Sequence, residues 1–187
     1  LTAPFGNEPL EIVLNFAEEA GISCLEVVAH PGSKHIDPGS LDRGLARQIR
    51  DMLEERGLEV SSLAYYEPRI TDPKVTERAQ AHAKKAIDGA STLGVGTVCM
   101  ITGYPADGMS KIETIEKVLP KIFGPILSHA RKKKVSIAVE NWYATCLQGI
   151  DTFECLFQAI PQENFGLNYD PSHLYHQECD HLLPVSM

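Results

Sequence analysis

Short apolar segments that end in a polar or charged residue recur along this chain and alternate with amphipathic helical segments. The expected strands are residues 22–28, 58–64, 97–102, 136–140 and 165–170, and residues 1–5 resemble the end of one further strand. A segment with helical periodicity follows each of the earlier strands. Strands that alternate with helices form parallel sheets with right-handed crossover connections. The pattern therefore predicts an α/β fold.

The strand ends follow one another at intervals of about 30 to 40 residues, close to the repeat of a (β/α)8 TIM barrel. A doubly wound sheet is the alternative, but no Gly-x-Gly-x-x-Gly follows the first strand, and Gly94-Val-Gly96 precedes a strand instead. Residues 1–187 are thus expected to form a single partial domain. The expected fold is an incomplete barrel with about strands 1 to 6 present and the last two βα units missing.

Two further structural expectations follow from this pattern. Pro120 and Gly124-Pro125 fall inside the helical segment that begins near Ser110, and they should kink that helix or divide it in two. An incomplete barrel would also expose a sheet edge and part of its core. Such a chain should be marginally stable, aggregation-prone or a homo-oligomer.

The charge balance limits the class of partner. With 25 acidic and 17 basic residues, the chain has a formal net charge of −8 at pH 7. Nucleic-acid binding depends on Lys and Arg that neutralise phosphates, so no nucleic-acid partner is expected. The dense basic run at residues 131–134 falls at the expected end of a helix, where cations complement the helix dipole.

Cysteine usage and hydropathy bear on the compartment. The five cysteines are odd in number and lack Cys-x-x-Cys spacing, which favours neither a disulfide framework nor a zinc knuckle. No apolar run approaches the roughly 20 residues of a membrane span, so no membrane partner is expected. These features favour a cytoplasmic protein.

Two of the expected strands end in a carboxylate, at Glu140 and Asp170. The segment between them is about one strand–helix–strand unit long, so the two side chains should lie side by side at the C-terminal rim. A hard divalent cation needs several oxygen ligands from separate elements. His173 could add a nitrogen ligand or hold a substrate oxygen. The alternative for each acid alone is a helix cap or a loop hydrogen-bond partner.

The segments Ala-Val-Glu-Asn-Trp at 138–142 and Asn-Phe-Gly-Leu-Asn-Tyr-Asp-Pro-Ser-His at 164–173 resemble the xylose isomerase-like barrel superfamily, in its sugar (phosphate) isomerase/epimerase branch. Residues 20–26 are similar to the second-strand entry of that branch. The resemblance covers essentially the whole chain, and the order and spacing of the motifs carry it.

The resemblance implies roles for three residues. Glu140 resembles the fifth-strand glutamate that binds the metal and exchanges a proton with the sugar carbon. Asp170 resembles the sixth-strand metal ligand, and His173 the histidine of the Asp-x-x-His motif, which contacts substrate oxygen or a second metal. In relatives, a histidine on strand seven and a glutamate on strand eight complete the site. Neither has a counterpart here, so this chain alone is expected to be inactive or weak.

The implied substrate is a small-molecule sugar or sugar phosphate. A metal that bridges a carbonyl and a neighbouring hydroxyl acidifies the adjacent C–H, and a nearby carboxylate removes the proton. Mn²⁺, Mg²⁺ or Co²⁺ suits an oxygen-rich site, and Zn²⁺ one with more imidazoles. The alternatives are an inosose-type dehydratase of the same superfamily and an inactive fragment held by a partner.

Some positions depart from subfamily patterns or carry weaker expectations. Residues 143–146 offer no second acid, which argues against free ketohexose epimerisation, and residues 65–67 lack the histidine of endonuclease IV relatives. Side chains at expected strand exits could line the sugar pocket, although each alone is more often a packing or loop residue: His30, Tyr66, Thr102, Trp142 and Tyr143. His176 and His181 could be extra ligands or part of a surface tail.

Overall fold

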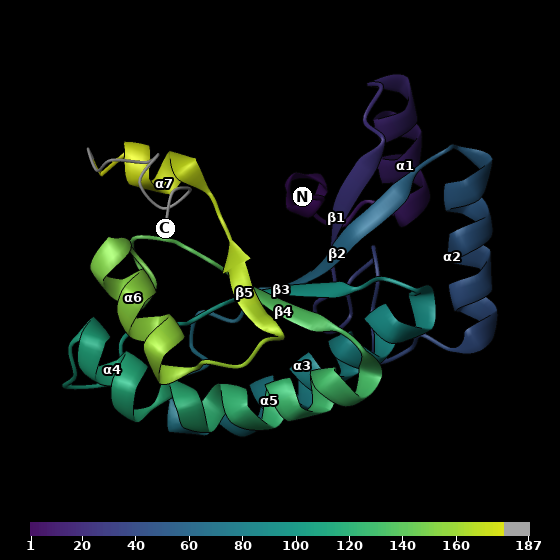
Figure 1. The fold of residues 1–187 in the computed structure, drawn as a ribbon. Helices are drawn as coiled ribbons and strands as arrows, with labels where there is room; N and C mark the ends of the chain where they lie inside the picture. Colours follow the sequence, from purple (N-terminus) through teal and green to yellow (C-terminus); the bar gives the residue numbers. More distant parts are fainter. Residues whose placement is uncertain (178–187) are drawn as a thin grey trace.

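A parallel sheet of five strands forms the centre of the molecule. In this computed structural model, which describes residues 1–177, the strands lie in chain order from β1 to β5, and every neighbouring pair is parallel (Figure 1). The strands are β1 Cys24–Val28, β2 Glu59–Tyr65, β3 Thr97–Ile101, β4 Ser136–Glu140 and β5 Phe165–Asn168. A parallel sheet in which each strand pairs with the next is the order found in a β/α barrel.

Helices connect the strands and pack on the sheet. They are α1 Leu10–Glu19, α2 Arg43–Glu55, α3 Pro73–Leu93, α4 Lys111–Lys117, α5 Leu119–Lys133, α6 Ile150–Ala159 and α7 Pro171–Tyr175, with a short 3₁₀ turn, η1, at Ala3–Phe5. Figure 1 shows α3 and α5 side by side against one face of the sheet. α7 follows β5 directly, so it begins at the C-terminal edge of the sheet.

Alternate strand residues face opposite sides of the sheet. Leu25 and Val27 of β1 and Ile137 and Val139 of β4 are buried in the core that the strands share with the helices. The intervening positions point to the other side, which in a barrel is the interior. Several of these interior positions carry polar side chains, and this arrangement creates the candidate site.

The expected strand end at residues 1–5 is wrong. Residues 3–5 form the turn η1 rather than the end of a strand, with Pro4 in its first positions. Proline has no backbone N–H for a strand ladder, and its fixed φ suits the start of a helical turn. The Thr2 N–H still donates to the Glu26 carbonyl oxygen at 2.9 Å, so the chain runs beside β1 at that residue. The described residues therefore contain five strands.

The helical segment after β3 is divided, as the prolines predicted, but at only one of the two positions. α4 and α5 meet at Val118, and Pro120 lies in the first turn of α5, where it needs no backbone hydrogen bond. Pro125 lies inside α5 without dividing it. The change in direction at Val118 lets α4 pack against α6 while α5 packs against α3.

The first turn of α4 predicts a pH-dependent contribution to stability. Ser110 and Glu113 form a capping box, with the Ser110 N–H donating to the Glu113 carboxylate at 3.0 Å. That hydrogen bond, with Lys117, lowers the pKa of Glu113 to about 2. Because the folded-state pKa lies below the unfolded value, the stabilisation is present above about pH 4.5 and is lost as the pH falls toward 2.

Glu113→Gln should therefore lower the free energy of unfolding at pH 7 and have a smaller effect at pH 3. Urea denaturation at the two pH values measures both differences. Glu116→Gln, at an exposed position of the same helix, is the matched control. An equal loss of stability at both pH values would contradict a role for the Glu113 charge.

Candidate metal centre

Three ligand side chains meet at the C-terminal edge of β4 and β5. Glu140 is the last residue of β4, Asp170 lies two residues beyond the end of β5, and His173 is in α7. One ligand atom from each lies within 4.8 Å of the other two, and all three residues are partly buried. Because β4 and β5 are parallel neighbours with Glu140 opposite Asn168, the two chain segments leave the sheet at the same rim.

Asp170 is both a helix cap and a member of this cluster. Its Oδ1 accepts the Ser172 N–H at 2.8 Å, which caps the first turn of α7. Its Oδ2 lies 3.6 Å from His173 Nε2, and the same nitrogen lies 3.8 Å from Glu140 Oε1. The capping alternative is therefore compatible with a metal site, because the two carboxylate oxygens have different neighbours.

Asn141 fixes the backbone of Asp170 relative to β4. Its side-chain amide donates to the Asp170 carbonyl oxygen and accepts the Asp170 N–H, both at 2.8 Å. Asn141 is fully buried, so these bonds do not compete with water. The pair of bonds continues the β4–β5 pairing beyond the last ladder position and sets the distance between the two carboxylates.

The pKa values of Glu140 and Asp170 are shifted in opposite directions. Burial raises the pKa of Glu140, and the nearby Glu26 and Asp170 carboxylates add to the shift against the effects of Tyr66 and His173. Burial also acts on Asp170, but hydrogen bonds from Ser172 outweigh it and lower the pKa of Asp170. When the pKa values of two neighbouring acids differ in this way, one acid can serve as a proton acceptor while the other remains an anion.

A third carboxylate, Glu26 of β1, lies in the barrel interior and contacts Asn168, which also contacts Glu140. Its oxygens accept the Tyr66 hydroxyl at 2.8 Å, the Ser62 hydroxyl at 2.9 Å and the Asn168 amide at 3.4 Å. Asn168 Nδ2 is also 3.4 Å from Glu140 Oε2. Glu26 was not predicted as a site residue, although a charged residue between the apolar neighbours Leu25 and Val27 is an unusual occupant of a buried strand.

Tyr66 and His30 lie at the rim, as expected, but their polar atoms contact protein. The Tyr66 hydroxyl donates to Glu26, and its pKa is raised by burial, by hydrogen bonding to Glu140 and by the Glu26 charge. A hydroxyl has one proton, so it serves one carboxylate at a time. His30 Nε2 accepts the Tyr66 N–H at 3.3 Å, and burial lowers the pKa of His30. This ring nitrogen therefore already accepts a hydrogen bond from the backbone.

The remaining expected rim residues divide into buried and exposed groups. Thr102 is fully buried, and its hydroxyl accepts the Leu147 N–H at 3.0 Å. It therefore stabilises the loop after β4 and does not line a pocket at the rim. Trp142 packs between Tyr104 and Tyr143, with ring centroids 6.1 Å and 5.7 Å apart, and both tyrosines are exposed. Trp142, two residues beyond Glu140, is itself half-buried, and Tyr143 is the more exposed of the two tyrosines beside it.

Of the two C-terminal histidines, His176 lies in the described part of the chain and is not a member of the cluster. His176 is exposed, and its ring stacks edge-on against Tyr175 at 6.2 Å. His181 lies outside the described residues.

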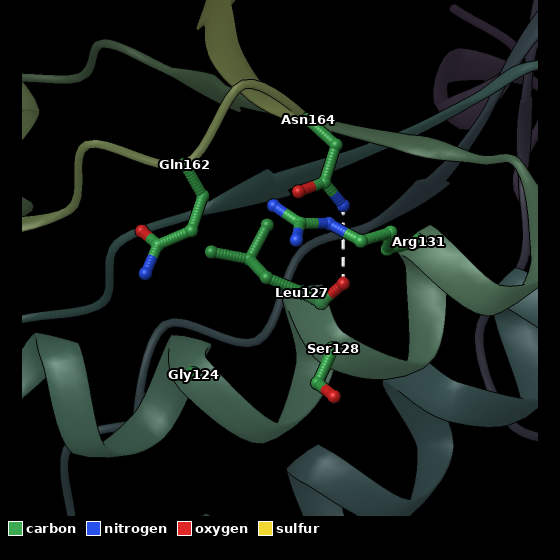
Figure 2. A pocket seen from close by; sticks show the side chains of 6 residues that line it. All are labelled: Gly124, Leu127, Ser128, Arg131, Gln162 and Asn164. Atoms are coloured by element: carbon green, nitrogen blue, oxygen red, sulfur yellow. Dashed lines mark hydrogen bonds between the residues drawn. The ribbon is translucent and has the colours of Figure 1, made fainter.

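A separate cavity of about 220 Å³ lies at the opposite end of β5. Its lining residues come from α5 and from the segment before β5: Gly124, Leu127, Ser128, Arg131, Gln162 and Asn164 (Figure 2). Asn164 donates to the Leu127 carbonyl oxygen at 3.1 Å across it. Because Asn164 precedes β5 whereas Asp170 follows it, this cavity is not part of the carboxylate cluster.

A parallel sheet in which each strand pairs with the next, with acidic side chains at its C-terminal rim, is the arrangement of the TIM-barrel class of proteins. Within that class, the chain belongs to the xylose isomerase-like TIM barrel family, whose family model matches residues 14–183. It is 26% identical to an uncharacterized protein of Bacillus subtilis strain 168, YfiH, over 98% of this chain and 66% of that protein.

Solved structures show the same fold at lower identity. A zinc-bound IolI protein matches with a TM-score of 0.74 and 18% identity over 94% of this chain and 63% of its own. The probable 3-DHS dehydratase AsbF of Bacillus anthracis matches with a TM-score of 0.74 and 16% identity, over 94% of this chain and 62% of its own. A D-psicose 3-epimerase solved with D-fructose matches with a TM-score of 0.72 and 12% identity, over 92% of this chain and 62% of its own. The chain thus spans less than two thirds of the length of these relatives.

None of the helices among residues 1–177 is both long enough and apolar enough to cross a membrane.

Proposed function

We propose that this chain carries the metal-binding part of a sugar or sugar-phosphate isomerase or epimerase site. The observation that carries the proposal is the convergence of Glu140, Asp170 and His173 within 4.8 Å at the barrel rim. Two carboxylates and one imidazole are a fitting donor set for Mn²⁺, Mg²⁺ or Co²⁺, and also for Zn²⁺. Membership in the family and the epimerase-like fold support the assignment.

Glu140 is the residue best suited to accept the substrate proton. It is partly buried, and its raised pKa brings it closer to the working range of a general base than an ordinary carboxylate. Asp170, with its lowered pKa, would remain charged and hold the cation. When bound, the divalent ion would polarise a substrate carbonyl and acidify the neighbouring C–H. Glu140 would then remove that proton.

The aromatic pair that follows Glu140 in the chain supports a sugar as substrate. Trp142 is half-buried and Tyr143 is exposed, two and three residues beyond Glu140, and an aromatic ring there could stack on the C–H face of a sugar. The Tyr66 hydroxyl and His30 Nε2 bond to protein groups, so a direct substrate contact for them would require these bonds to break. His173 and Trp142 are thus the stronger candidates for substrate contact.

A dehydratase is the second candidate function. The probable 3-DHS dehydratase has the same fold as this chain, with a TM-score of 0.74, which is also the TM-score of the IolI protein. The same base, Glu140, would remove the proton next to a carbonyl, and a hydroxide would leave from the neighbouring carbon. The first step is common to both reactions, and only the fate of the intermediate differs.

The test uses this shared first step. The protein is incubated in D₂O with Mn²⁺ and a panel of ketoses, ketose phosphates and inososes, and the products are followed by NMR. Proton abstraction should place deuterium on the carbon next to the carbonyl, and this exchange needs only one base. A new stereoisomer or an aldose supports an isomerase or epimerase, whereas loss of water supports a dehydratase. Absence of exchange with every sugar, under conditions in which Mn²⁺ is bound, would contradict both functions.

A further inference from the structure

Glu140 has one oxygen toward the candidate metal cluster and the other toward the barrel interior. Its Oε1 lies 3.8 Å from His173 Nε2. Its Oε2 lies 3.4 Å from the Asn168 amide nitrogen, which is itself 3.4 Å from Glu26 Oε2 and 3.3 Å from the Tyr66 hydroxyl. Asn168 therefore connects Glu140 Oε2 to Glu26 and Tyr66 in the barrel interior.

Glu26 is the common partner of these interior groups. Tyr66 and Ser62 donate to different oxygens of the Glu26 carboxylate, and Asn168 approaches the same oxygen as Ser62. The contact with Ser62 depends on a register shift between Leu25 and Glu26, which places Ser62 opposite Glu26 on the neighbouring strand. The strands β1, β2, β4 and β5, or the residues directly after them, thus supply one connected group of side chains: Glu26, Ser62, Tyr66, Glu140 and Asn168.

We infer that Glu26 is a positioning residue for the candidate metal centre: through Tyr66 and Asn168 it orients Glu140 so that Oε1 faces Asp170 and His173. This inference rests on the proposed metal site and adds a residue to it. Groups behind a metal ligand fix the direction of its donor atom, and their loss weakens metal binding typically 10- to 100-fold. Glu26 does not itself belong to the three-residue cluster within 4.8 Å.

A Glu26→Gln substitution can distinguish a positioning role of Glu26 from simple structural support. Glu26 accepts from three donors, so a glutamine in its place would direct an N–H₂ group at some of them. Because Tyr66 and Asn168 contact different oxygens of Glu26, one of them would lose its acceptor and could reorient. The volume in the barrel interior would be unchanged, which limits the effect on packing.

The experiment is a Mn²⁺ titration of the full chain, with free Mn²⁺ measured by electron paramagnetic resonance. Glu26→Gln should raise the Mn²⁺ dissociation constant about 10- to 100-fold. Tyr66→Phe, which removes only the hydroxyl, should weaken binding in the same direction. Because both changes break the same series of contacts, the double variant should bind about as weakly as Glu26→Gln alone. Glu59→Gln, an exposed glutamate on β2, is the matched control and should bind as the wild type does.

The outcomes distinguish this inference from the proposed function. If Glu26→Gln and Tyr66→Phe lower the melting temperature but leave Mn²⁺ affinity unchanged, the two residues are structural and the inference is wrong. If Glu140→Gln itself binds Mn²⁺ like the wild type, the metal centre is wrong. Loss of binding in Glu140→Gln together with wild-type binding in Glu26→Gln would overturn the positioning role alone.

Discussion

Replacing Glu140 by glutamine is expected to weaken Mn²⁺ binding more than about 100-fold, because loss of a ligand should exceed the 10- to 100-fold effect of losing a group behind a ligand. Glutamine keeps the length of the side chain but removes the negative charge of Glu140 from the three-residue cluster. A hard divalent cation depends on that charge. Deuterium exchange into the substrate should disappear as well, because an amide cannot accept the proton.

The same substitution should not destabilise the metal-free protein. Burial raises the pKa of Glu140, which means that the charged carboxylate is less favourable in the folded than in the unfolded state. This penalty is absent at pH values below the unfolded pKa and develops as the pH rises. At pH 7 the melting temperature of Glu140→Gln should thus equal or exceed that of the wild type.

Calorimetric titration with Mn²⁺ and thermal melting measured by circular dichroism test both parts of this prediction. Glu59→Gln on β2 serves as the control for replacing a strand glutamate. Wild-type Mn²⁺ affinity in Glu140→Gln would place any cation elsewhere in the protein. A large drop in melting temperature without metal would show instead that Glu140 supports the fold.

The main features of the fold could be predicted from the sequence because they depend on local patterns. The two apolar runs that lead to Glu140 and Asp170 are neighbouring parallel strands, so the adjacency of these two acids followed from strand order. The turn at residues 3–5 was missed, because a short apolar stretch does not by itself distinguish a strand from a helical turn.

The interior contacts could not be predicted in the same way. The partner of Tyr66 is Glu26, which is 40 residues away in the chain, and the Asn168 contact with Glu26 spans 142 residues. Such pairs depend on strand register and on the curvature of the sheet, and neither is encoded in the pattern of a single segment. Tyr66 was correctly expected at a strand exit, but its hydrogen-bond partner required the three-dimensional structure.

Gly103→Ala is expected to be the most destabilising single substitution at the rim. Gly103 follows β3 with a φ of +80°, and a Cβ atom there would lie 2.6 Å from Ile70 Cγ2 and 3.3 Å from the Pro68 carbonyl oxygen. Ile70 is fully buried and cannot move aside without disturbing the core. The unfavourable backbone conformation and the overpacking each cost about 1–3 kcal/mol, which gives an expected loss of about 4 kcal/mol.

Gly108→Ala separates the two contributions. Gly108 has a similar φ of +72°, but a Cβ atom added there would meet no other atom within 4 Å. It should lose only about 1 kcal/mol, the cost of the backbone conformation. Urea denaturation of the two variants gives the difference directly, and equal losses would show that Ile70 yields without penalty.

The effect of Gly103→Ala should also reach the candidate site. The Gly103 carbonyl oxygen accepts the Cys146 N–H at 2.9 Å, and the Trp142 N–H donates to the Leu147 carbonyl oxygen at 2.9 Å, so the loop that follows Glu140 is tied to Gly103. A shift of Gly103 away from Ile70 would pull on this loop. Mn²⁺ affinity should therefore fall in Gly103→Ala under conditions in which the protein is still folded, whereas Gly108→Ala should retain wild-type affinity.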